Sequence, residues 1–311
     1  MENLIMGFNL IFPVFFIIIL AYILKKINII DDSFIATSTK FVFYIVLPIK
    51  LFFDIKNSES RGFDFKYVIY LLVVILVAFF LSWALGRILI KENTKLSAFV
   101  HCSFRSNFVF IGIPVIEAIM GNLPMDSVIA AMIFGPTLYN ILATFILTYY
   151  GDGKLSISSF IIKVLKNPMI IGTLLGLFAK FINLPIYSGI EDGAIMLSKL
   201  CTPLSLILIG GSLDFSAGRE DLGIVLTSSI IKDALIALIA IPIGVMLDFT
   251  SSQLVVAFVF FASPCAVNCF IMGKQMGSDA KLTSKIVTMS FALSIITYSI
   301  GISLLKSRGI L

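Results

Sequence analysis

The sequence predicts an all-α membrane protein that crosses the bilayer many times, and its composition and the length of its apolar stretches both support this fold class. Hydrophobic residues make up 59% of the 311-residue chain, charged residues make up 13%, and the mean hydropathy is +1.06. A soluble protein needs about a quarter of its residues charged to cover its surface. The net charge of +5 is spread over short loops, so it bears on membrane orientation and indicates no nucleic-acid partner.

Ten apolar stretches are long enough to cross a hydrocarbon core roughly 30 Å thick. In chain order they are 5–24, 34–54, 66–88, 96–121, 125–150, 167–183, 190–213, 222–247, 252–273 and 284–305. Pro48 in the second span and Pro203 in the seventh are expected to kink their helices. Twelve basic residues follow the odd-numbered spans and six lie on the other side, so both termini are expected outside the cytoplasm.

Recurring motifs indicate an internal duplication. LPIKLFF, which contains Pro48, recurs as TPLSLIL, which contains Pro203, 155 residues later, and a Met-Gly pair ending at Gly121 recurs at Gly277, 156 residues later. Because each half holds five spans, an odd number, the second half must enter the membrane from the opposite face. The predicted organisation is one repeat over 1–150, a short cytoplasmic linker over 151–166 and a second repeat over 167–311.

The fourth and ninth spans are expected to be interrupted helices. Gly112 and Pro114 lie at the middle of the fourth span, and Pro264 lies in the ninth. Proline removes a backbone donor and obstructs the carbonyl four residues earlier. Unpaired backbone at membrane depth is tolerated only where it is packed in protein or lines a water-filled cavity. The two spans therefore predict a polar site within the membrane.

Polar residues of these two spans are the candidate substrate-binding residues. The N-terminus of a half-helix suits a carboxylate, and the carbonyls at a C-terminus suit a cation. The amides of Asn107 and Asn268 would add donors and acceptors, or they would only cap the half-helices. The predicted set is Asn107, Gly112, Pro114, Ser263, Pro264, Asn268 and Arg105.

Charged residues inside the spans are the candidates for ion coupling. Arg105, about 13 Å along its span, would attract an anionic substrate, pair with an acid such as Glu117 or extend to the interface. His101 is expected to be a packing residue or a proton relay. Lys232 and Asp233 point about 100 degrees apart, so each needs its own partner, either in transport coupling or in a structural ion-pair network.

The cysteines are expected to be small buried residues. Cys102, Cys201, Cys265 and Cys269 fall inside apolar segments without CxxC spacing, and the one histidine cannot complete a metal site with them. No metal or cofactor is therefore expected, apart from a coupling proton or sodium ion.

Three segments resemble the auxin efflux carrier family, including its bacterial malonate- or malate-permease-like members. They are FRSNFVFIGIP in the fourth span, SPCAVNCFIMGKQMGSDAKLTSKIV from the ninth span onward, and the LP-containing second span. The resemblance covers the whole chain and implies a PIN-like, bile acid/auxin transporter-type fold in which helices four and nine cross at their breaks. It also implies a homodimerising scaffold from spans one, two, six and seven, and a mobile transport part, as in an elevator, from spans three to five and eight to ten. The short linker puts auxin itself in doubt as the substrate.

The predicted function is a secondary active transporter, a permease that carries a small organic anion such as a carboxylate across the cell membrane by alternating access. The alternatives are a sodium-coupled bile-acid-type symporter and a sodium–proton antiporter on a related fold. An antiporter would need paired acids deep in one helix, whereas the fifth span has no acid after Asp126. The sequence offers no Ser/His pair or acid dyad that would indicate an intramembrane enzyme.

Overall fold

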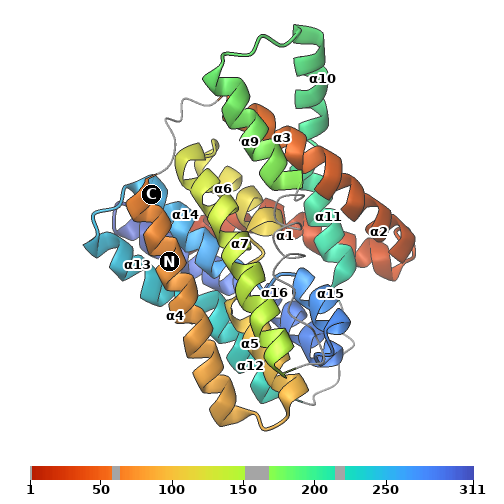
Figure 1. The fold of residues 1–311 in the computed structure, drawn as a ribbon, viewed down its shortest axis with the longest axis vertical. Coiled ribbons are helices and arrows are strands. Elements are labelled where there is room, and N and C mark those ends of the chain that lie inside the picture. Colours follow the sequence, from red (N-terminus) through yellow and green to blue (C-terminus); the bar gives the residue numbers. More distant parts are fainter. Residues whose placement is uncertain (1, 58–63, 151–167, 214–220) are drawn as a thin grey trace. The chain divides into compact units, whose positions relative to one another are not determined.

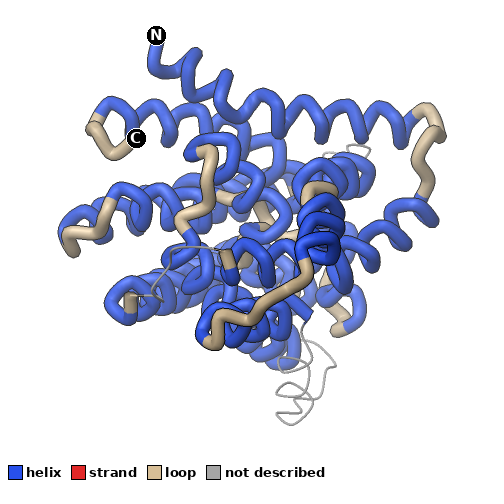
Figure 2. Tube along the Cα trace, turned by 90° about the horizontal axis from the view of Figure 1, so that it is seen from above, coloured by secondary structure: helices blue, strands red, loops and turns tan. Residues whose placement is uncertain are grey.

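Helices account for almost all of the structure (Figures 1 and 2). The computed structural model describes residues 2–57, 64–150, 168–213 and 221–311, and in these ranges it contains no strand. The predicted linker 151–166 lies outside the described residues. In chain order the elements are α1 (Glu2–Lys26), α2 (Asp32–Phe41), η1 (Val42–Val46), α3 (Leu47–Lys56), α4 (Phe65–Leu89), α5 (Asn93–Phe104), η2 (Phe108–Gly112), α6 (Ile113–Met120), α7 (Met125–Tyr150), α9 (Pro168–Phe181), α10 (Ser188–Ser198), α11 (Cys201–Ser212), α12 (Leu222–Ile230), η3 (Ile231–Leu235), α13 (Ile236–Met246), α14 (Ser251–Ala262), α15 (Asn268–Gln275) and α16 (Ala280–Ser307).

Seven helical stretches in the described part of the chain are long and apolar enough to cross a membrane. They coincide with the first, second, third, fifth, seventh, eighth and tenth predicted spans. The other three predicted spans contain shorter helices, namely α9 and the helices of the two interrupted stretches. The chain is therefore an all-helical, multi-pass membrane protein.

The chain divides into two compact units. The first comprises Met1–Pro13, Asp64–Leu155 and Leu213–Leu311, and the second comprises Val14–Phe63 and Ser156–Ser212. Within the second unit, α9 packs closely against α3 (Figure 1) because glycines remove the side chains that would separate their backbones. A Cβ added to Gly172 would lie 2.7 Å from the carbonyl oxygen of Pro48.

Two of the prolines follow a π-helical turn. η1 ends two residues before Pro48 and η2 ends two residues before Pro114. In each turn the backbone N–H of the following residue bonds to the carbonyl five residues earlier. This wider turn accommodates a proline ring that would obstruct an ordinary α-helical turn. Pro203 lies in the first turn of α11, just after the break between α10 and α11.

Both predicted interruptions exist, but the first lies elsewhere than expected. α5 ends at Phe104 and η2 begins at Phe108, so the helix breaks over 105–107 and not at Gly112 and Pro114. The π-helical turn η2 absorbs Pro114 inside the helix, so the backbone does not need to break there. In the ninth span, α14 ends and α15 begins on either side of a segment that includes Pro264, as predicted.

The bounds of the helices recur along the chain at nearly constant spacing. α4 has 25 residues, and the helical stretch Leu222–Met246, also 25 residues long, begins 157 residues later. α5 and α14 both have 12 residues and begin 158 residues apart. Gly121 and Gly277, 156 residues apart, end α6 and follow α15 with φ angles of 74° and 76°. Helix bounds in the described part of the chain therefore recur at spacings of 156–158 residues.

Candidate functional site

The two helix interruptions lie against each other within the first unit. Two backbone hydrogen bonds and an isolated antiparallel bridge join them. The bonds run from Asn107 N–H to the Pro264 carbonyl at 2.8 Å and from Ala266 N–H to the Arg105 carbonyl at 3.3 Å, and the bridge pairs Ser106 with Cys265. These bonds satisfy polar backbone groups that the ends of the half-helices would otherwise leave unpaired in an apolar environment.

Arg105 is a buried cation beside this joint. It occupies the extended segment between α5 and η2, and the residue is 7% exposed. Its guanidinium donates to Asn140 Oδ1 at 2.7 Å and lies 3.3 Å from His101 Nε2. Among the described residues it forms no ion pair, so it neither pairs with Glu117 nor extends outward as the two alternatives proposed. A buried cation without a carboxylate attracts an anion.

Asn107 and Asn268 occupy matching positions at the starts of the two second half-helices. Asn107 immediately precedes η2 and is 6% exposed, whereas Asn268 is the first residue of α15 and is exposed. Neither side chain bonds to a described residue, so neither caps its half-helix. Both amides are therefore available where helix N-termini favour negative charge.

Gly112 allows η2 to approach Ser263. A Cβ added to Gly112 would lie 3.0 Å from Ser263 Oγ and 2.5 Å from Phe108 Cδ2. Ser263 is fully buried, and its Oγ donates to the Val259 carbonyl at 2.7 Å. The Tyr298 hydroxyl, 2.8 Å away, must therefore donate to Ser263. Gly112 and Ser263 thus fix the shape of the joint.

Lys232 and Asp233 are fully buried in η3 and support the second interruption. Lys232 Nζ donates to the Phe261 carbonyl at 2.7 Å, in the last turn of α14. Ser290 Oγ accepts the Cys265 N–H at 2.7 Å and donates to Asp233 Oδ1 at 2.7 Å. Asp233 Oδ2 has no hydrogen-bond partner in the described ranges, and the two charged residues form no direct ion pair there.

The other two coupling candidates lie in different environments. His101 is 1% exposed and faces Arg105, so its ring is a buried hydrogen-bonding group. Glu117 is half-buried on α6.

Sequence reasoning missed three residues of this region. Asn140 holds the guanidinium of Arg105, Ser290 links Asp233 to the interrupted backbone, and Tyr298 binds Ser263. Asn140 was detectable as an amide in an otherwise apolar span, because such residues within a membrane usually bond across helices. Ser290 and Tyr298 have common residue types for the tenth span, so nothing in the sequence distinguishes them.

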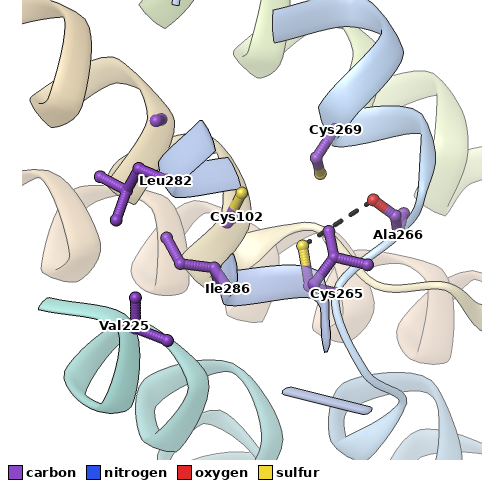
Figure 3. Close-up of a cluster of buried hydrophobic side chains, with 9 residues drawn as sticks. Cys102, Val225, Cys265, Ala266, Cys269, Leu282 and Ile286 are labelled. Carbon is purple, nitrogen blue, oxygen red and sulfur yellow. Dashed lines mark hydrogen bonds between the residues drawn. The ribbon is translucent and has the colours of Figure 1, made fainter. Parts of the chain in front are cut away.

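Three cysteines gather beside the same joint. All four cysteines are buried, as expected. The Sγ atoms of Cys102, Cys265 and Cys269 lie within 4.8 Å of one another (Figure 3), although 163 residues separate Cys102 from Cys265 in the chain. Sequence spacing does not reveal this group, because tertiary packing brings the three thiols together.

Comparison with known proteins identifies the family. The model of the membrane transport protein family matches residues 6–302. An uncharacterized transporter of Methanothermobacter thermautotrophicus is 23% identical over 295 residues, which cover 90% of this chain and 92% of that protein. The family match confirms the resemblance that the motifs of the second, fourth and ninth spans indicate. The chain therefore belongs to the membrane transport protein family, the auxin efflux or PIN-like family of transporters.

Proposed function

We propose that this protein is a secondary active transporter that carries a small organic anion, such as a carboxylate, across the cell membrane by alternating access. The observation that carries the proposal is the joint between the two interrupted helices, with Arg105 buried beside it and bonded to no acid among the described residues. A carboxylate would supply the missing negative charge and accept hydrogen bonds from the amides of Asn107 and Asn268.

The proposed architecture is a pair of inverted five-helix repeats whose fourth and ninth helices cross at the joint. The recurrence of helix bounds at spacings of 156–158 residues supports the duplication. The first unit contains predicted spans three to five and eight to ten, which fits a transport part. The second unit contains spans two, six and seven and most of span one, which fits a scaffold that forms a homodimer. The transport part moves against this scaffold, and both termini lie outside the cytoplasm.

Lys232 and Asp233 are the residues through which an ion would couple to transport. Lys232 binds the Phe261 carbonyl, and Asp233 binds Ser290, which accepts the Cys265 N–H, so we assign both residues first to holding the shape of the second interruption. A proton would reach the same region through Asp233, whose second oxygen has no partner among the described residues. Asp233→Asn keeps the acceptor for Ser290 and removes the titratable group, so it separates the two roles. A purely structural role predicts that uptake by this variant still responds to a pH gradient.

Uptake of radiolabelled monocarboxylates and dicarboxylates into proteoliposomes tests the proposal, with and without pH and sodium gradients. Losing one hydrogen bond to a charged substrate costs about 1.5–3 kcal/mol, so Asn107→Ala and Asn268→Ala are each expected to lower uptake at least about tenfold. Asn122→Ala, in the exposed turn after α6, is the matched control and should transport normally. Normal uptake by both site variants would remove the asparagines from the site. Uptake of no organic anion, together with thermal stabilisation by sodium alone, would favour the sodium-coupled alternative.

A further inference from the structure

The transport proposal makes no use of the three clustered thiols. Cys102 lies on α5, Cys265 lies in the second interruption and Cys269 lies on α15, and their exposures are 0%, 2% and 0%. All three sulfur atoms lie within 4.8 Å of one another. In Figure 3 the three side chains converge from these different segments, with Leu282 and Ile286 beside them. Three separate parts of the fold therefore direct thiols to one place.

The residues around the three thiols do not bind the sulfur atoms strongly. Apolar residues that include Val225, Leu282 and Ile286 form the wall of the cluster. The hydrogen bonds at the thiols are long contacts with backbone carbonyls: Cys265 Sγ to the Ala266 oxygen and Cys269 Sγ to the His101 oxygen, both at 3.8 Å. Hydrogen bonds this weak do not prevent the thiols from binding another group.

The spacing of the three sulfur atoms suits a thiolate-bound metal ion. A zinc–sulfur bond is about 2.3 Å long, so three sulfurs around one ion in a plane are about 4.0 Å apart. Sulfurs already within 4.8 Å of one another reach this distance with small side-chain rotations. Thiolates are soft ligands, and they favour ions such as zinc and other d10 metals over magnesium or calcium.

A buried cation also lies beside the cluster. Three thiolates and one divalent ion carry a net charge of −1. Lys232 lies close enough to Cys265 and Cys269 to interact electrostatically with both, and Ser290, which accepts the Cys265 N–H, also donates to Asp233. The ammonium group of Lys232 therefore favours the net negative charge of a metal–thiolate group at this position.

We propose that Cys102, Cys265 and Cys269 form a three-thiolate site for a divalent d10 metal ion of the zinc and cadmium class. Three thiol protons leave as three metal–sulfur bonds form, and no electron is transferred. The bound ion links α5 to the second interruption and to α15, so it stabilises the joint. This site is independent of the transported substrate.

Titration of the purified, reduced, full-length protein with cadmium chloride tests the site. We expect one cadmium ion to bind per chain, with sulfur-to-cadmium charge-transfer absorption in the ultraviolet and with release of three protons. Cys201→Ser is the matched control, because Cys201 is the fourth buried cysteine and lies on α11 outside the cluster. Serine in place of any one of the three clustered cysteines should weaken binding at least about tenfold. Equal binding by the wild type and all three variants would overturn the proposal.

X-ray absorption spectroscopy of the cadmium-loaded wild type gives a readout that needs no variant. The proposal predicts three sulfur neighbours for each cadmium ion. A first shell dominated by oxygen or nitrogen, fewer than three sulfur neighbours, or no stoichiometric binding at all would refute it.

Discussion

Ser290 is a small residue on which two buried polar groups depend, so Ser290→Ala gives a sharp test of how the second interruption is held. Its Oγ accepts the Cys265 N–H and donates to Asp233 Oδ1, both at 2.7 Å. Ser290 and Asp233 are both fully buried. Alanine would remove both bonds and would leave too little room for water to replace the hydroxyl.

The expected cost follows from the number of groups left unsatisfied. A buried donor or acceptor without a partner costs about 1–3 kcal/mol, and more if it is charged. Ser290→Ala leaves one such donor and one such acceptor, so we expect the free energy of unfolding to fall by about 2–6 kcal/mol. If the carboxyl group of Asp233 is ionised, we expect the fall in the free energy of unfolding to lie in the upper half of this range.

Ser294 supplies a matched control one turn further along α16. It is also fully buried, but its Oγ donates only to the Phe291 carbonyl of its own helix, at 2.7 Å. Ser294→Ala should therefore lower the free energy of unfolding by no more than about 1 kcal/mol. Equilibrium unfolding in mixed micelles measures both variants. Equal stability of Ser290→Ala and Ser294→Ala would show that the hydroxyl of Ser290 does not hold the interruption.

Two further predictions concern glycines that lie in close contact with other residues. Each is paired with a control glycine at which an added Cβ would have no atom within 4 Å. Gly112→Ala should lower the free energy of unfolding by about 1–3 kcal/mol because its Cβ would press on the phenylalanine ring one turn earlier, whereas Gly223→Ala should be neutral or slightly stabilising. Gly210→Ala should cost about 3 kcal/mol or more, because its Cβ would overlap the backbone oxygen of Ile18, while Gly193→Ala should stabilise by up to about 1 kcal/mol. The same unfolding assay measures all four variants, and a pair that responds equally would contradict the assigned contact.

The joint between the interrupted helices combines two kinds of support. Backbone bonds connect the two breaks directly. On the second side, Lys232 binds the end of α14, and Asp233 binds Ser290, which accepts the Cys265 N–H of the loop. Burying these charges is costly, so the bond from Lys232 to the Phe261 carbonyl and the bond from Ser290 to Asp233 give a physical reason for their presence in an apolar span. On the first side, Arg105 is bonded to Asn140 and His101 and to no acid among the described residues, which leaves its charge for a ligand.

The sequence alone determined the all-α, multi-pass class of the protein, the extent of several helices and the existence of two interruptions. Apolar length and proline chemistry act within about 20 residues, so they can be read directly from the chain. The predicted 66–88 span is α4 (Phe65–Leu89), and the predicted 125–150 span is α7 (Met125–Tyr150). Asn107, Lys232 and Asp233 were also identifiable, because polar residues in apolar spans are costly and therefore conspicuous.

Only the tertiary structure decided where the first helix breaks and which side chains meet there. Pro114 predicted a break at its own position, but a π-helical turn accommodates it and the break lies at 105–107. The partners of Asp233 and the grouping of Cys102 with Cys265 join residues far apart in the chain. Such contacts depend on how whole helices pack, and a local pattern of residue types does not predict that packing.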